Sequence, residues 1–174
     1  SCLADISEGD KESCEKLMYA LILSGLATQM AGNSRPASCA EHQISHLWEL
    51  EVLNGPLDAL HGEMISVGTI IVLREYKRIA RAIREGRCSV RAQWEDDTEL
   101  LEKTFGSRGF FEGIVEENTP DPLLKISPAR LEACLDEIAG LIEELPEEEE
   151  LARMMDRAGC KRSVYEIGLS EEII

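Results

Sequence analysis

The sequence has few aromatic residues and few basic residues for its size. Phe, Trp and Tyr make up 5% of the 174 residues, whereas 18 basic residues stand against 34 acidic ones, a formal net charge of −16. Leu, Ala, Glu and Ile dominate instead, and this mixture favours helices over strands. Because so acidic a surface repels phosphate backbones, a general nucleic-acid-binding role is disfavoured.

Several motifs are also missing. No unbroken apolar run reaches about 18 residues, so no membrane span is predicted. The six cysteines lack CxxC spacing and no secretory signal opens the chain, so we expect reduced thiols in a cytoplasmic protein. GxGxxG, the P-loop motif, HExxH and zinc-finger spacing are absent, and the chain therefore offers no dinucleotide or nucleotide cradle and no zincin-type protease site.

The apolar pattern predicts helices in the first half of the chain. Residues 16–30 are apolar nearly all round, which is typical of a helix buried on several sides, and Gly32 supplies a stop. A second helix is expected from Ser38, as N-cap of a capping box with Glu41, to about Leu53. A long helix is expected from residues 60–63 to a stop at Gly86.

The second half of the chain continues the helical pattern. Helices are predicted over residues 97–105, from Ser127 to about residue 144, and over 147–157, with residues 107–126 irregular. The sequence offers no convincing strand pair and no internal repeat. The predicted fold class is therefore all-α, with residues 1–174 as one helical domain.

All three histidines lie within 20 residues of one another, at His42, His46 and His61. A spacing of four places His42 and His46 on one helix face, and a turn at residues 54–56 can return His61 against them. Imidazoles from neighbouring helices bind zinc, and also nickel and iron. The cluster predicts an open metal site if a carboxylate joins it, and histidines with a purely structural role are the alternative.

Five short motifs around these histidines resemble the glycerol-1-phosphate dehydrogenases, members of the broader group of iron-containing alcohol dehydrogenases, glycerol dehydrogenases and dehydroquinate synthases. The dense similarity covers about residues 24–76. The motifs are Ser24-Gly25-Leu26-Ala27, Gly32-Asn33-Ser34-Arg35-Pro36-Ala37-Ser38, Glu41-His42-Gln43-Ile44-Ser45-His46, Leu60-His61-Gly62-Glu63 and Val67-Gly68-Thr69.

The resemblance implies a two-domain, dehydroquinate synthase-like dehydrogenase of which this chain is the C-terminal helical domain, binding metal and substrate. By the family pattern His42 and His61 are metal ligands and His46 faces the substrate. The divalent metal is expected to be zinc, with nickel or iron as alternatives. NAD(P) is expected to bind an N-terminal nucleotide-binding domain outside this sequence, where an aspartate ligand of the metal is also expected.

The implied reaction interconverts dihydroxyacetone phosphate and sn-glycerol 1-phosphate. We expect the isolated chain to be inactive, to work with its own nucleotide-binding domain and a small phosphorylated substrate, and to bind no nucleic acid; a homo-oligomer is left open. One alternative is a glycerol or simple-alcohol dehydrogenase of the same group. The other is a non-catalytic, acidic helical interaction module.

Three residues near the histidines have two interpretations each. Arg35 either binds the substrate phosphate, helped by N–H groups at the start of the next helix, or pairs with Glu41. Glu63 either caps its helix or supports His61. Cys39 stands where the family usually has glycine, and is either a small helix residue or a group that narrows the site or binds metal.

Overall fold

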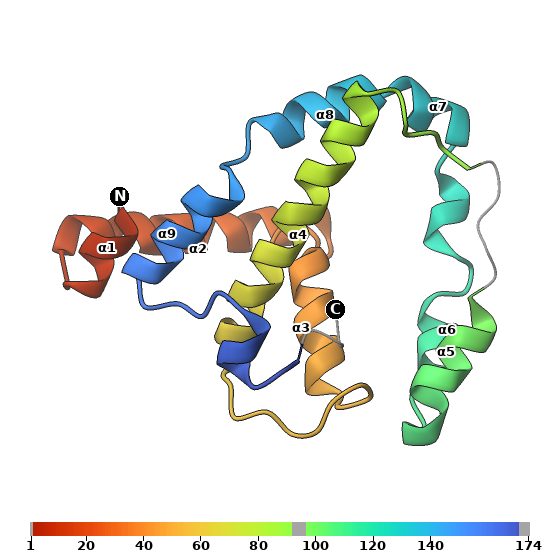
Figure 1. The fold of residues 1–174 in the computed structure, drawn as a ribbon, viewed down its shortest axis with the longest axis horizontal. Helices are drawn as coiled ribbons and strands as arrows, with labels where there is room; N and C mark the ends of the chain where they lie inside the picture. Colours follow the sequence, from red (N-terminus) through yellow and green to blue (C-terminus); the bar gives the residue numbers. More distant parts are fainter. Residues whose placement is uncertain (1, 92–96, 171–174) are drawn as a thin grey trace. The chain divides into compact units, whose positions relative to one another are not determined.

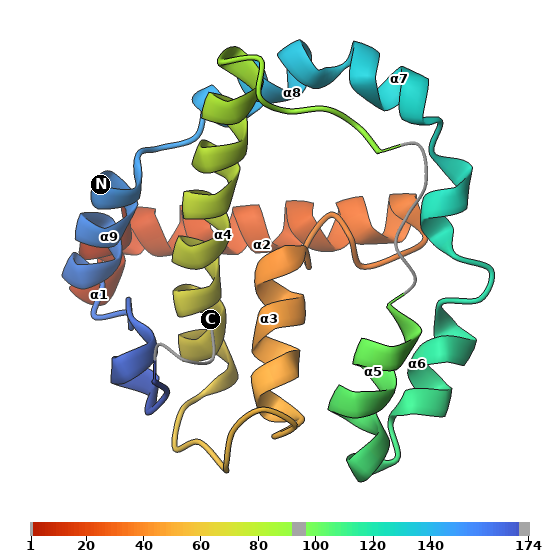
Figure 2. The same cartoon turned by 45° about the vertical axis from the view of Figure 1, so that its right-hand side comes forward.

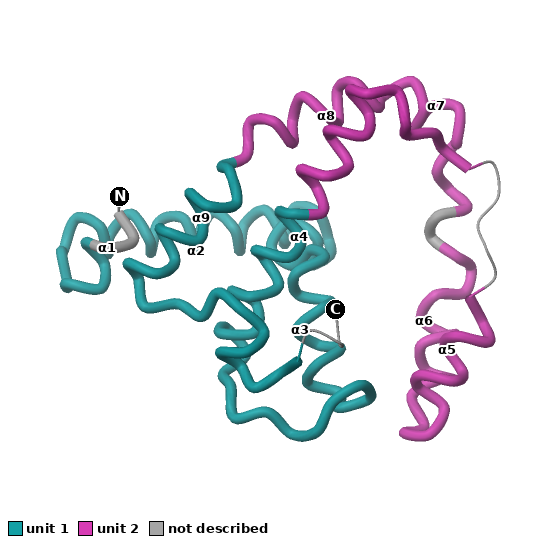
Figure 3. The backbone as a smooth tube through the Cα atoms, in the orientation of Figure 1, with its two compact units in different colours: residues 1–74, 146–174 teal, residues 75–145 magenta. Residues whose placement is uncertain are grey.

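The computed structural model describes residues 2–91 and 97–170, and within these ranges all regular structure is helical (Figure 1). The all-α prediction is confirmed. The chain divides into two compact units, residues 1–74 with 146–174, and residues 75–145 (Figure 3). None of the described helices is long and apolar enough to cross a membrane.

The first unit is built around the pair α3 (Ala40–Glu49) and α4 (His61–Arg84), which lie side by side in both views (Figures 1 and 2). It also contains α1 (Cys2–Ser7), α2 (Lys11–Ala31), α9 (Glu148–Arg157) and the 3-10 helix η3 (Val164–Ile167). Its core joins α3 and α4 to the C-terminal segment, and consists of Trp48, Met64, Val67, Val164, Ile167 and Leu169.

A glycine permits the close approach of α3 and α4. A β-carbon on Gly68 of α4 would lie 2.9 Å from the carbonyl oxygen of Glu41 and 3.4 Å from its Cα. Real β-carbons do not come that close to backbone atoms, so the two main chains can touch here only because position 68 has no side chain. This contact fixes the spacing of the two helices that carry the histidines.

The ends of helix α2 agree with the local sequence signals, but the burial of its side chains does not agree with the prediction. The Asp10 carboxylate accepts a hydrogen bond from the Ser13 backbone N–H at 2.8 Å, and Gly32 ends the helix with a left-handed φ of 67°. The prediction of burial on several sides is wrong, because Ile22 is 58% exposed and Met30 89%. An apolar pattern around a helix needs neighbours on every side, and the described chain leaves most of this surface uncovered.

The boundaries of α3 differ from those predicted, whereas those of α4 do not. The N-cap is Cys39 rather than Ser38, and the Glu41 carboxylate accepts a hydrogen bond from the Cys39 N–H at 3.1 Å. The helix ends at Glu49 instead of Leu53, and Glu51 then adopts a left-handed φ of 54°. The predicted extent of α4 is confirmed, with a left-handed turn at Gly86.

The second unit contains the remainder of α4, α5 (Thr98–Phe105), α6 (Phe111–Glu117), α7 (Pro128–Ala133) and α8 (Leu135–Glu143), with the 3-10 helices η1 (Gly106–Arg108) and η2 (Pro122–Lys125). Ser127 caps α7 as predicted, accepting from the Arg130 N–H at 3.4 Å. Residues 107–126 are less irregular than predicted because they include α6. The core of this unit comprises Ala80, Ile83, Ala139 and Ile142.

Candidate functional site

The three histidines come together where one face of α3 lies beside the start of α4. The ring centroids are 5.3 Å apart for His42 and His46, 4.9 Å for His42 and His61, and 5.3 Å for His46 and His61. Ser45, completely buried, donates a hydrogen bond to the His42 carbonyl of its own helix at 2.8 Å. Trp48, two residues after His46 and so on the opposite side of α3, is buried in the core of the unit.

Two ring nitrogens from different helices face each other directly. His42 Nε2 and His61 Nε2 are 3.2 Å apart, although 19 positions separate the residues in sequence. Two nitrogens that each lie about 2.0–2.1 Å from a tetrahedral zinc ion are about 3.3–3.4 Å apart. The observed separation thus suits a shared metal ion, and His42 and His61 are the pair that the family resemblance indicates as ligands.

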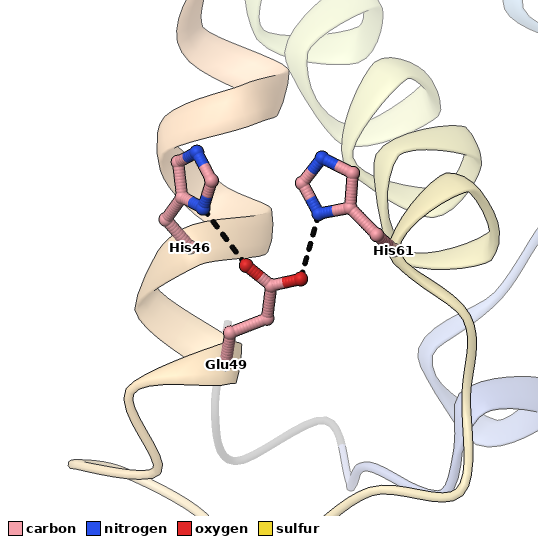
Figure 4. A group of neighbouring side chains, drawn as sticks. All are labelled: His46, Glu49 and His61. Atoms are coloured by element: carbon pink, nitrogen blue, oxygen red, sulfur yellow. Dashed lines mark hydrogen bonds and ion pairs between the residues drawn. The ribbon is translucent and has the colours of Figure 1, made fainter.

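A carboxylate that the sequence analysis missed joins the cluster. Glu49, the last residue of α3, accepts hydrogen bonds from His46 Nδ1 at 2.8 Å and His61 Nδ1 at 2.6 Å, one on each oxygen (Figure 4). Potential ligand atoms of these three residues all lie within 4.8 Å of one another. The available signal was the spacing His46-x-x-Glu49, which places the carboxylate one helical turn after the histidine.

The surroundings of Glu49 favour its charged form. Partial burial acts to raise the pKa of the Glu49 carboxyl, but the hydrogen bonds from His46 and His61, with the attraction of both rings, outweigh this effect and lower the pKa below its ordinary value. The carboxylate is therefore ionised at neutral pH and acts only as a hydrogen-bond acceptor.

A small cavity adjoins the cluster on the His61 side. Its volume is about 220 Å³, and it is lined by Trp48, Glu49, Glu51, Leu57, Ala59, His61 and Met64. The core residues Trp48 and Met64 form part of its lining, so the cavity lies where the hydrophobic core of the first unit reaches the histidine site.

Arg35 and Glu41 are not joined to each other or to the cluster. Arg35 lies exposed in the loop before α3, and the described structure contains no ion pair between it and Glu41, whose carboxylate is occupied by the Cys39 N–H. Glu41 accepts from the N-cap residue of its helix as predicted, but the predicted capping box does not form, because the N-cap is Cys39 and its side chain makes no capping hydrogen bond. The Cys39 thiol is exposed and donates to the Arg35 carbonyl at 3.2 Å.

Glu63 has the first of its two predicted roles. Its carboxylate accepts a hydrogen bond from the Leu60 backbone N–H at 2.8 Å and so caps the start of α4. The carboxylate that contacts His61 is Glu49 instead, because the chain between α3 and α4 folds back and brings the end of one helix beside the start of the other.

The fold and the site define an all-helical protein with a histidine–carboxylate cluster shared by two helices. Relatives named glycerol-1-phosphate dehydrogenase (NAD(P)+) match it. One from Geobacillus thermodenitrificans is 28% identical over 173 residues, 99% of this chain and 36% of the relative. The match to Pyrococcus furiosus is 53% identical over 64 residues, 37% of this chain and 18% of the relative. A match to Methanothermobacter thermautotrophicus is 39% identical over 87 residues, half of this chain and 24% of the relative.

The resemblance seen in the sequence is thereby confirmed: the chain is similar to proteins named glycerol-1-phosphate dehydrogenase, at 28% identity over almost its whole length and at up to 53% identity over shorter stretches. It spans only about a third of the length of the two relatives that match nearly all of its own residues. No family model and no solved structure matches the chain.

Proposed function

We propose that this chain is the metal- and substrate-binding helical domain of an NAD(P)-dependent oxidoreductase that interconverts dihydroxyacetone phosphate and sn-glycerol 1-phosphate. The observation that carries the proposal is the 3.2 Å separation of His42 Nε2 and His61 Nε2, from two helices whose spacing is fixed by backbone contact. The names of the relatives supply the reaction.

The residues present fit a divalent metal ion. Imidazole nitrogens suit zinc, nickel and iron. His42 and His61 would hold the ion, and a site with only these two protein ligands leaves positions for an aspartate from the remainder of the enzyme and for a substrate oxygen. When bound, the ion would supply Lewis-acid polarisation of the C2 carbonyl oxygen of the substrate.

His46 is proposed to contact the reacting end of the substrate. Its side chain is half exposed and lies one helical turn after His42, with the two ring centroids 5.3 Å apart. Since its Nδ1 is engaged by Glu49, its Nε2 is the atom left for the substrate. In the direction of alcohol oxidation, Nε2 would take the hydroxyl proton of C2 while the hydride leaves C2 for the nicotinamide ring.

Arg35 is proposed to bind the substrate phosphate. The Arg35 residue is exposed in the loop that leads into α3. Its guanidinium forms no ion pair with the Glu41 carboxylate in the described structure, and that carboxylate accepts from the Cys39 N–H instead. An always-charged, planar guanidinium suits a phosphate dianion. The substrate of this proposal is therefore a phosphorylated triose rather than glycerol or a simple alcohol.

The nucleotide is proposed to bind outside these 174 residues. The printed sequence has no glycine-rich dinucleotide motif, and the relatives named for NAD(P)+ are almost three times as long as the part matched here. A cytoplasmic location, and assembly with an N-terminal nucleotide-binding domain or into a homo-oligomer, belong to the same proposal.

Metal binding by the purified chain tests the site. Metal-free protein is titrated calorimetrically with zinc and, separately, with nickel and iron(II) under reducing conditions. The parent chain is expected to bind one ion, and His42→Ala and His61→Ala to abolish binding, whereas Gln43→Ala on the exposed side of α3 leaves it unchanged. Equal affinity in all four proteins would show that the histidines are structural and favour the helical interaction module.

A further inference from the structure

The position of Glu49 gives it a role that the family resemblance does not supply. One carboxylate spans two helices: Oε2 accepts from His46 on its own helix at 2.8 Å, and Oε1 accepts from His61 of α4 at 2.6 Å. A single side chain therefore contacts both the residue proposed to hold the metal and the residue proposed to contact the substrate.

An ionised carboxylate can only accept hydrogen bonds. Both rings must therefore carry their proton on Nδ1, because a lone pair there would face a negative oxygen. A neutral imidazole with its proton on Nδ1 presents a lone pair on Nε2. Figure 4 shows that the second ring nitrogens of His46 and His61 point the same way, away from Glu49.

We propose that Glu49 is a positioning residue that fixes His46 and His61 at once in the Nδ1–H tautomer. The inference rests on the proposed function, since it gives His61 an Nε2 lone pair for the metal and His46 an Nε2 lone pair for a substrate hydroxyl. It also fixes the ring planes, because each Nδ1–H must point at its own carboxylate oxygen.

The surroundings of His61 support this assignment. Its Nε2 lies 3.2 Å from His42 Nε2, so the lone pair that Glu49 places on His61 points to where a shared ion would lie. Metal-bound imidazoles commonly donate their other N–H to a carboxylate, and removing that carboxylate typically lowers metal affinity by roughly 10- to 100-fold. Glu49 completes such an arrangement for His61 and extends it to the neighbouring ring.

Replacing the carboxylate by an amide gives a distinctive expectation. Glu49→Gln has one acceptor oxygen and one donor NH2 group in place of two acceptors. The oxygen can keep one ring in the Nδ1–H form, but the NH2 group requires a lone pair on Nδ1 of the other ring and so moves its proton to Nε2. Glu49→Ala removes both acceptor oxygens, so that neither ring is held in the Nδ1–H tautomer.

The tautomers can be read directly by nitrogen-15 NMR of the histidine rings. The spectra are recorded on the metal-free 174-residue chain at about pH 8.5, where ordinary imidazoles are neutral. The parent protein is expected to show Nδ1–H forms for His46 and His61, Glu49→Gln to convert one of them to Nε2–H, and Glu49→Ala to give mixed tautomers at both. The control, Glu15→Gln on exposed α2, makes the same charge change and leaves all rings as in the parent.

Unchanged Nδ1–H tautomers in Glu49→Gln and Glu49→Ala would overturn the role of Glu49, whatever the metal does. Zinc titration of the same samples then separates this role from the proposed function. Zinc should shift the Nε2 resonances of His42 and His61 in the parent, with roughly 10- to 100-fold weaker binding in Glu49→Gln. Zinc coordination at His61 Nδ1, recognised by loss of the proton on that nitrogen, would place the ion between His61 and Glu49 and refute the positioning role. Absent zinc binding with the expected tautomers would instead refute the metal site alone.

Discussion

Gly68 of α4 lies so close to α3 that a β-carbon at this position would be 2.9 Å from the carbonyl oxygen of Glu41. Glu41 directly precedes His42, and Gly68 lies two turns after His61 on its helix. The residues of this backbone contact are therefore close in sequence to His42 and His61, whose Nε2 atoms are 3.2 Å apart. The separation of the two rings depends on helices that meet main chain to main chain, without an intervening side chain.

Gly68→Ala is expected to lower the free energy of unfolding by about 1–3 kcal/mol, because the added methyl group must push α4 away from a rigid carbonyl. Urea denaturation measures the change. Gly62→Ala, in the same helix but with no atom within 4 Å of its added β-carbon, should be neutral or slightly stabilising. Equal effects of the two substitutions would contradict the close contact.

Two isoleucines test the burial that the structure assigns. Ile167 of η3 is 3% exposed, and Ile167→Ala is expected to destabilise the chain by about 2–5 kcal/mol through lost apolar burial and the cavity left behind. Ile22 of α2 is 58% exposed, and Ile22→Ala should change stability by less than about 0.5 kcal/mol. The comparison uses the midpoints of urea denaturation, with the dependence of the unfolding free energy on urea concentration held equal for all variants. Similar losses of stability in the two variants would mean that α2 is covered in solution.

The ion pair of Arg74 and Glu148 joins α4 to α9 and gives a pH-dependent contribution. Hydrogen bonding and attraction by the Arg74 guanidinium lower the pKa of the Glu148 carboxyl. A carboxyl whose pKa is lower in the folded state stabilises the fold above its unfolded pKa, and loses this effect as the pH falls through the folded-state value. Since both side chains are partly exposed, the contribution is below about 1 kcal/mol.

Glu148→Gln should therefore lower the unfolding free energy at pH 7 and make no difference in acid, below the folded-state pKa. Urea denaturation across this pH range measures both limits. The control is Glu149→Gln, an exposed neighbour in the first turn of the same helix. A difference between Glu148→Gln and the parent that persists undiminished in acid would rule out the ion pair as its source.

The 174-residue chain alone is expected to show no NAD(P)-dependent turnover of dihydroxyacetone phosphate, because its sequence contains no dinucleotide motif. The assay follows the absorbance of NADH and NADPH with the zinc-loaded chain and excess substrate. Measurable oxidation of either cofactor above a sample without protein would place the nucleotide site within these residues. It would reject the proposal that the nucleotide binds in another part of the enzyme.

In an enzyme that includes this chain and its nucleotide-binding part, Arg35→Ala should raise KM for dihydroxyacetone phosphate with a smaller effect on kcat, because the phosphate is distant from the reacting carbon. The nonphosphorylated substrate dihydroxyacetone provides the control, since Arg35→Ala should leave its KM unchanged. An unaltered KM for the phosphorylated substrate would remove Arg35 from the site.

Local chemistry predicted most helix ends, because Gly32, Gly86 and the Ser127 cap act on residues next to them. The burial of side chains was less predictable. The apolar surface of α2 indicates that other segments should cover it, but the sequence of the helix does not identify those segments. Glu49 was missed for a related reason. Its contact with His61 depends on how the chain between α3 and α4 turns back, and no spacing within either helix encodes that turn.

The helix α4 belongs to both compact units, with residues 61–74 in the first and 75–84 in the second. His61 in its first turn and Arg84 in its last are thus joined by one continuous ladder of backbone hydrogen bonds, whose formation is cooperative. Local opening events and their amide-exchange rates are consequently linked along it. A substitution at Ala139, in the core beside the far end of α4, can shorten the lifetime of the histidine site without touching any of its atoms.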